Sequence, residues 1–236
     1  MNLAIDIGNT SIKAATFLND ELLELHRLDE LYELESLIER NTYDAISVCS
    51  VRQSRQQLLA QVSGLEQAFF LSIDSAIPIE VSYDTPDTLG MDRLAAAIGA
   101  HVLYPNKSVL IIDLGTCITY DLVHQATFQG GLISPGMNMR CRAMHEFTAN
   151  LPLVKASASA ELIGKSTVES MSKGVFFGVL GELEHHVSQL LLKIPDLKVI
   201  MTGGDAHLFE SKIKSDIFVA PQIVLVGMNG VSRYNA

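Results

Sequence analysis

One short pattern occurs twice in the sequence, and this repeat limits the possible fold more than any other feature. Residues 3–13 read LAIDIGNTSIK and residues 110–120 read LIIDLGTCITY. Each copy joins a hydrophobic run to an aspartate, a glycine and a threonine, and then returns to alternating apolar residues. Such a run predicts a buried strand, a turn at the glycine and a second strand. A chain that contains this pattern twice is expected to have a duplicated fold.

The segments around the two copies also repeat. A third strand near residues 22–28 completes the first meander. The second meander consists of 108–115, 117–123 and 126–134. The other expected elements are helices at 30–40, about 54–62 and 91–104, strands at 44–50, 68–72 and 197–204, a long helix after residue 164 and a helix near the C-terminus. We therefore expect an α/β protein of two similar lobes, 1–105 and 106–236, with the active site in a cleft between them.

Composition excludes several classes of protein. The 236 residues are 48% hydrophobic, which is enough for a substantial core, but no run of about 18 apolar residues appears. Asp6 and Asn9 interrupt the region where a signal peptide would be apolar, so we expect a cytoplasmic protein. A net charge of −10 argues against nucleic acid and membrane surfaces as partners. Cys49, Cys117 and Cys141 fit neither a disulfide framework nor a zinc site, and we expect reduced thiols.

The two aspartates stand where a nucleotide-binding site would need them. Asp6 and Asp113 each end a hydrophobic run and precede a glycine turn with exposed backbone N–H groups. Such amides bind phosphate oxygens, while a carboxylate binds the cation that neutralises them. One such turn alone is more simply an ordinary hairpin whose aspartate caps backbone amides. The second copy, together with MTGGDA at 201–206, favours a nucleotide, because Gly203 and Gly204 would let an adenine or ribose lie against the backbone.

A segment that looks like a phosphate-binding loop has a different interpretation. GKST at 164–167 matches the end of a Walker A motif, but that motif needs a glycine five residues before Gly164, where this chain has Ser159. The pattern predicts instead the start of a long helix, with Ser166 or Thr167 near its N-terminus. Glycines at spacings of four and three residues indicate a helix face packed closely against another element or a second subunit. They are Gly174, Gly178 and Gly181.

Seven motifs together carry a family resemblance. In chain order they are DIGNTSIK, GMDRLAA, DLGTCITYD, GGLISPGM, FTANLP, IGKSTVESMSKG and TGGDA. The series resembles the type III pantothenate kinases, whose superfamily includes acetate and sugar kinases, heat-shock chaperones and actin. The resemblance covers nearly the whole chain. It implies a duplicated ribonuclease-H-like (actin-like ATPase) fold, a homodimer, and ATP-dependent phosphorylation of pantothenate, the first step of coenzyme A biosynthesis. It also implies Mg²⁺ and a monovalent cation, K⁺ or NH4⁺.

The resemblance further implies roles for individual residues. Asp92 would be the catalytic base, Asp6 the magnesium ligand and Asp113 the monovalent-cation ligand. The implied ATP-binding residues are Asp6, Ile7, Gly8, Asn9, Thr10, Ser11, Ile12, Lys13 and Thr116. The implied pantothenate-binding residues are Tyr83, Gly90, Met91, Asp92, Arg93 and Thr167. Cys117 departs from the family pattern, in which alanine is usual at this position.

Elementary chemistry supports these roles and also leaves alternatives. A primary hydroxyl is a poor nucleophile, so phosphoryl transfer benefits from a carboxylate such as Asp92 that accepts its proton. The alternative is that Asp92 only stabilises a helix N-terminus. Arg93 is suited to bind a substrate carboxylate, or is a plain surface charge. Lys13, on the face of the second expected strand, is either solvated or close to the phosphates.

Three other functions remain open at the level of sequence. A kinase for another small alcohol or carboxylate would use the same phosphate-binding turns. A nucleotide-binding regulator would bind ATP without turnover. A nucleotide hydrolase related to actin would release phosphate without an acceptor.

Overall fold

The computed structural model describes all residues, Met1–Ala236, and divides into two compact units. The first unit comprises Met1–Lys107, Val123–Gly130 and Gln222–Ala236. The second unit comprises Ser108–Leu122 and Gly131–Pro221. None of the helices is both long and apolar enough to span a membrane.

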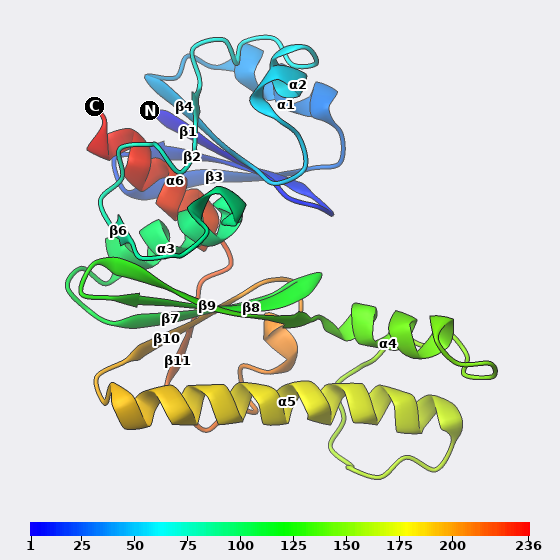
Figure 1. The fold of residues 1–236 in the computed structure, drawn as a ribbon. Coiled ribbons are helices and arrows are strands. Elements are labelled where there is room, and N and C mark those ends of the chain that lie inside the picture. The colour runs from blue at the N-terminus through cyan, green and yellow to red at the C-terminus, as the bar shows by residue number, and fades with distance from the viewer. The chain divides into compact units, whose positions relative to one another are not determined.

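The first unit is built on a five-stranded sheet of order β3-β2-β1-β4-β5. The strands are β1 (Asn2–Ile7), β2 (Ile12–Leu18), β3 (Glu21–Leu28), β4 (Ala45–Ser50) and β5 (Phe69–Phe70). Helices α1 (Leu31–Arg40) and α2 (Arg55–Leu59) lie on one face, and α3 (Met91–Leu103) and α6 (Ile223–Tyr234) lie on the other (Figure 1). Because helices cover both faces, the middle of the central strand β1, Leu3–Ile5, is apolar and fully buried.

Two glycines allow α3 and α6 to cross at close range. A Cβ placed on Gly227 would lie 1.9 Å from the Ala95 carbonyl oxygen, and one on Gly99 would lie 2.2 Å from the Ile223 carbonyl oxygen. No residue larger than glycine fits at either position without a shift of the backbone. Because α6 also packs on β1 and β4, this crossing fixes the position of α3, whose first residues are Met91, Asp92 and Arg93.

The second sheet repeats the strand order of the first. Its order is β11-β10-β7-β8-β9-β6. The strands β9, β8, β7, β10 and β11 correspond in this order to β3, β2, β1, β4 and β5 of the first sheet, and β6 is an additional strand beside β9. The strands are β6 (Glu80–Val81), β7 (Val109–Leu114), β8 (Cys117–His124), β9 (Thr127–Pro135), β10 (Lys198–Thr202) and β11 (Ile217–Val219). In the second unit, α5 (Thr167–Lys193) runs along the sheet, and α4 (Met137–Glu146) follows β9 (Figure 1). The repeat seen in the sequence is therefore a repeat of topology.

Most expected elements are present, and the differences involve short ones. Helix α2 ends at Leu59, three residues before the end of the expected helix. The strands β6 and β11 and the 3₁₀ helices η1 (Pro86–Thr88) and η2 (Ala206–Leu208) were not predicted. Elements of two or three residues are too short to show a hydrophobic period. They depend on tertiary partners, as β6 does on β9 through the pair Val81 and Phe128.

Candidate functional site

The end of β1 and the turn that follows it form the first part of the candidate site. The predicted ATP-binding segment, residues 6–13, spans the end of β1, the turn and the start of β2. The Gly8 N–H donates to the Ser11 carbonyl oxygen at 3.1 Å and closes the turn. Lys13 is directly opposite Asp6 in the antiparallel ladder. Since opposite residues project from the same face of a sheet, the lysine and the carboxylate flank the same region.

The first residues of α3 include a second carboxylate, Asp92, which lies near the same buried thiol as Asp6. Burial raises the pKa of the Cys49 thiol, and the charges of Asp6 and Asp92 raise this pKa further. Both carboxylates therefore lie near one buried thiol on β4. The Asp92 Oδ1 also accepts a hydrogen bond from the Arg93 backbone N–H at 2.8 Å. A Cβ on Gly90 would lie 2.6 Å from that oxygen, so glycine leaves room for this orientation of the carboxylate.

Arg93 is enclosed by aromatic rings. It is only 7% exposed, and its guanidinium carbon lies 5.7 Å from the ring centroid of Tyr83 and 5.7 Å from that of Phe128. The two ring centroids are 5.9 Å apart. Gly130, with φ +83°, leaves room for the Tyr83 ring, since a Cβ there would lie 3.3 Å from it. Rings around a guanidinium hold its orientation, which is useful for bidentate recognition of a carboxylate.

Phe128 and Gly130 were not among the predicted site residues. They lie on β9, far from Tyr83 and Arg93 in the sequence. Pairing of β6 with β9, in which the Ser82 N–H donates to the Phe128 carbonyl oxygen at 2.9 Å, brings them together. The adjacent glycines at 130 and 131 were a visible signal, but they do not say which ring would lie against them.

In the second unit, the second acidic turn lies against the glycine pair after β10. Asp113 and Thr202 are partners in the parallel ladder of β7 and β10. A Cβ on Gly203, whose φ is +91°, would lie 2.4 Å from the Asp113 Oδ1. The Asp205 N–H donates to the Leu114 carbonyl oxygen at 3.1 Å. The ends of these two strands therefore form one surface made of a carboxylate and exposed glycine backbone.

The turn between β7 and β8 is held by the segment that begins α4. The Gly115 N–H donates to the Cys117 carbonyl oxygen at 3.1 Å, and Thr116 is exposed at the tip. The Gly136 N–H donates to the Thr116 carbonyl oxygen at 3.1 Å. A Cβ on Gly136 would lie 2.4 Å from the Gly115 carbonyl oxygen. Three segments, after β7, β9 and β10, thus meet around this turn.

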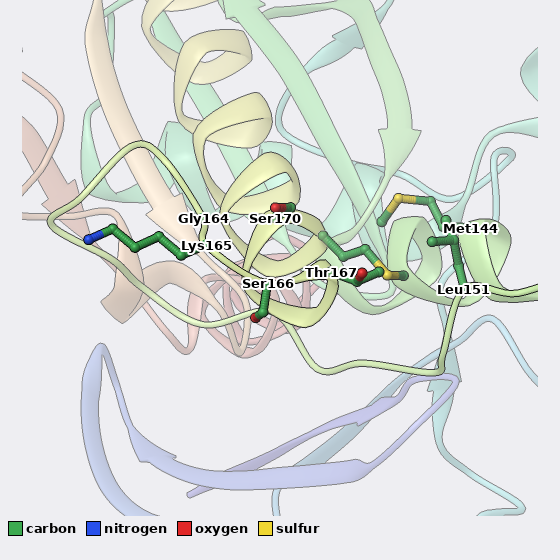
Figure 2. A pocket seen from close by; sticks show the side chains of 8 residues that line it. Met144, Leu151, Gly164, Lys165, Ser166, Thr167 and Ser170 are labelled. Carbon is green, nitrogen blue, oxygen red and sulfur yellow. The ribbon is translucent and has the colours of Figure 1, made fainter.

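Thr167 lines a pocket at the start of α5. Ser166 is the N-cap, and its hydroxyl accepts from the Glu169 N–H at 3.3 Å, as the sequence predicted for this helix start. The open pocket has a volume of about 670 Å³. Its lining consists of Met144, Leu151, Gly164, Lys165, Ser166, Thr167, Ser170 and Met171 (Figure 2). Hydroxyls beside methionine and leucine side chains suit a small molecule with both polar and hydrocarbon parts.

The carboxylates fit cations that are also coordinated by phosphate oxygens. No group of three or more His, Cys, Asp or Glu side chains is arranged to hold a metal ion. Mg²⁺ is commonly bound by one or two carboxylates together with substrate phosphates and water. A single carboxylate such as Asp6, at the end of β1, fits that mode of binding.

Comparisons with known proteins identify the same family that the sequence motifs resemble. A sequence model of the type III pantothenate kinase family matches residues 2–189. A type III pantothenate kinase from Cytophaga hutchinsonii is 38% identical over 236 residues, which are 100% of each chain. Another from Christiangramia forsetii is 40% identical over 250 residues, covering 100% of this chain and 99% of the relative.

Solved structures share the fold. A protein from Campylobacter jejuni, named for the Baf family of transcriptional activators, has a TM-score of 0.64 at 21% identity and covers 99% of this chain and 98% of its own. A ROK family glucokinase from Streptomyces griseus, solved with glucose and AMPPNP, has a TM-score of 0.52 at 11% identity, with 98% of each chain covered. Together with the two sheets of like topology, these similarities confirm the predicted duplicated ribonuclease-H-like α/β fold.

Proposed function

Because this chain belongs to the type III pantothenate kinase family, we propose that it transfers the γ-phosphoryl group of ATP to the primary hydroxyl of pantothenate. The product is 4′-phosphopantothenate, and the reaction is the first step of coenzyme A biosynthesis. The observation that carries the proposal is the similarity to a type III pantothenate kinase over the full length of the chain. We propose residues 1–105 and 106–236 as the two copies of the duplicated sequence; in the fold, α6 at the end of the second copy packs within the first unit.

The first unit contributes the acceptor chemistry. Asp92 accepts the proton of the pantothenate hydroxyl as the hydroxyl oxygen bonds to the γ-phosphorus, and the bond from that phosphorus to ADP breaks. Arg93, fixed by the rings of Tyr83 and Phe128, binds the carboxylate of pantothenate. Gly90 and Met91 shape the backbone beside it. Thr167 is proposed as a further pantothenate contact, either in its own subunit or across the dimer interface.

We propose that backbone and hydroxyl groups bind the nucleotide. Residues 6–13, with Lys13 opposite Asp6, and Thr116 bind ATP. Asp6 holds Mg²⁺, and Asp113 holds the monovalent cation, K⁺ or NH4⁺. When bound, these cations neutralise the charge of the phosphates and of the phosphoryl group in transfer.

The protein is expected to act in the cytoplasm as a homodimer, with no nucleic-acid or membrane partner. Its cysteines are free thiols, which fits a reducing compartment, and its net charge is −10. On α5, a Cβ on Gly174 or Gly181 would meet no atom of this chain within 4 Å. A glycine face without a partner in its own chain fits close approach by a second subunit.

Substitution of Gly174 by arginine is expected to convert the dimer to a monomer, because a long charged side chain prevents close approach on this exposed face. Light scattering coupled to gel filtration measures the mass directly. Gln56→Arg, on the exposed surface of α2, is the control and is expected to stay dimeric. A dimer that persists in Gly174→Arg would show that the interface lies elsewhere.

Phe128→Leu is expected to raise the KM for pantothenate about tenfold, since Arg93 loses one of its two aromatic neighbours and its fixed orientation. The KM for ATP should stay within about twofold, because the nucleotide does not depend on this arginine. Phe70→Leu removes a comparable ring, 5.4 Å from the guanidinium carbon of Arg55, and is expected to change neither KM. Equal effects of the two substitutions would contradict a substrate role for the Phe128 ring.

A panel of acceptors tests the proposed function. Purified protein is incubated with ATP, Mg²⁺ and K⁺, and ADP formation is followed with pantothenate, sugars, acetate or no acceptor. We expect ADP formation only with pantothenate, and a lower rate without a monovalent cation. Turnover of sugars or acetate with none of pantothenate would identify a different kinase, and ADP formation without an acceptor would identify a hydrolase. ATP binding without any turnover would identify a regulator.

A further inference from the structure

A polar cluster in the second unit joins four elements around one carboxylate. Glu182, in the middle of α5, accepts hydrogen bonds from the Tyr120 hydroxyl on β8 at 2.8 Å and the Ser134 hydroxyl on β9 at 2.5 Å. Its other oxygen pairs with the Arg140 guanidinium from α4. The side chains of Arg140 and Glu182 are only 23% and 19% exposed. None of these residues was identified from the sequence.

The cluster keeps its carboxylate ionised. Burial opposes the charge of Glu182, but the hydrogen bonds from Ser134, Arg140 and Tyr120 outweigh burial and lower its pKa. Burial raises the pKa of the Tyr120 phenol, and the hydrogen bond to Glu182 and its charge raise that pKa further. Removal of one partner from such a pair leaves the other charge buried and uncompensated. The side chains of the cluster therefore depend on one another for their stability.

Arg140 extends this cluster to the turn after β7. Its Nε donates to the Pro135 carbonyl oxygen at 2.7 Å, while the same guanidinium is held by Glu182. The next residue, Gly136, donates its N–H to the Thr116 carbonyl oxygen at 3.1 Å and lies too close to Gly115 to carry a Cβ. A continuous series of contacts thus links Glu182 in the middle of α5 to the guanidinium of Arg140. From there it passes through the peptide between Pro135 and Gly136 to Thr116 in the turn after β7.

We propose that Glu182 and Arg140 are positioning residues, which hold the Gly115–Thr116 turn in the shape that binds the phosphates of ATP. This inference rests on the proposed kinase function. Neither side chain needs to touch the nucleotide, because both act through the backbone of Pro135 and Gly136. Arginine is required at position 140, since its fork lets Nε bind Pro135 while Nη2 binds Glu182, whereas lysine has one donor group.

The same helix provides a matched control. Arg142 and Glu146 form an ion pair at 3.1 Å within α4, with side chains 69% and 53% exposed. This pair has the same charges and lies two and six residues beyond Arg140 on the same helix, and the hydrogen bond of the Arg142 guanidinium goes to Glu146. Exposed pairs of this kind contribute little to stability.

The test compares Arg140→Lys, Glu182→Gln and the double variant with Arg142→Gln and Glu146→Gln. Affinity for a non-hydrolysable ATP analogue is measured by calorimetry with Mg²⁺ and K⁺, together with the KM values for ATP and pantothenate. The fraction of folded protein is checked by circular dichroism at the assay temperature. We expect each single variant to weaken analogue binding and raise the KM for ATP about tenfold. The KM for pantothenate and the behaviour of the control variants should stay within about twofold of wild type.

The double variant separates positioning from a purely structural role. Because both substitutions break one series of contacts, their effects on nucleotide affinity should not add. Gly136→Ala, which leaves the ion pair in place but pushes on the turn, should reproduce the loss of nucleotide affinity. Unchanged analogue affinity in folded Arg140→Lys and Glu182→Gln, even with a lower Tm, would overturn the positioning role alone. Wild-type protein that binds no ATP analogue would overturn the proposed function and this inference with it.

Discussion

Asp92→Asn is expected to lower kcat for pantothenate phosphorylation by a factor of about 10² to 10⁴, the usual range for loss of a general base. Asparagine keeps an oxygen that can accept from the Arg93 N–H, as the Asp92 Oδ1 does at 2.8 Å, so the start of α3 should retain its geometry. ATP affinity should therefore change by no more than about twofold. Single-turnover kinetics and calorimetric titration with ATP measure the two quantities separately.

A nearby carboxylate provides the control for this substitution. Asp87 lies exposed in η1, in the segment that leads to α3, and Asp87→Asn is expected to leave kcat within about twofold of wild type. Asp92→Asn also loses a favourable interaction with the helix dipole, worth about 0.3–1 kcal/mol. That loss lowers stability slightly and does not change kcat. An Asp92→Asn enzyme with normal turnover would show that this carboxylate only stabilises the helix.

Gly227→Ala is expected to destabilise the protein by about 3 kcal/mol, because the new Cβ meets backbone that cannot rotate away. The contact concerned is the Ala95 carbonyl oxygen, 1.9 Å from the position of the Cβ. The helices α3 and α6 must separate, and the start of α3 then moves away from β4. For a chain of this size the Tm should fall by roughly 6 to 12 °C. Differential scanning calorimetry measures this shift, and kcat should fall as well.

Gly230→Ala, one turn further along α6, is the matched control. Its Cβ would lie 2.7 Å from Cγ2 of Val102, which is the end of a side chain and can shift. Alanine also favours the helix by about 1 kcal/mol relative to glycine, so the Tm should change little. Equal effects at positions 227 and 230 would contradict the importance of the backbone contact between the two helices.

The parts of the site that were predictable from sequence are those encoded locally. The end of β1, the turn after it and the start of α3 each follow from a hydrophobic run next to glycine and a polar residue. Asp6 and Asp113 therefore have the strand-end positions that the pattern predicted. Ser166 caps α5 for the same reason, since its hydroxyl and the helix N-terminus are adjacent in the chain.

The residues that were not predictable depend on contacts between distant segments. Phe128 lies beside Arg93 only because β6, a strand of two residues, pairs with β9. Glu182 appears in the sequence as one charge on a long helix, and only tertiary packing surrounds it with donors from three other elements. Similarly, nothing near residues 223–234 indicates that this helix packs against α3 and β1 of the first unit.

The most direct test of the proposed kinase activity identifies the phosphorus-containing products of the reaction. Wild-type protein is incubated with ATP, Mg²⁺, K⁺ and pantothenate, and the products are followed by ³¹P NMR. We expect one new phosphomonoester for each ADP formed, and no ADP when pantothenate is omitted. Release of inorganic phosphate in place of the phosphomonoester, or ADP formation that does not depend on pantothenate, would contradict it.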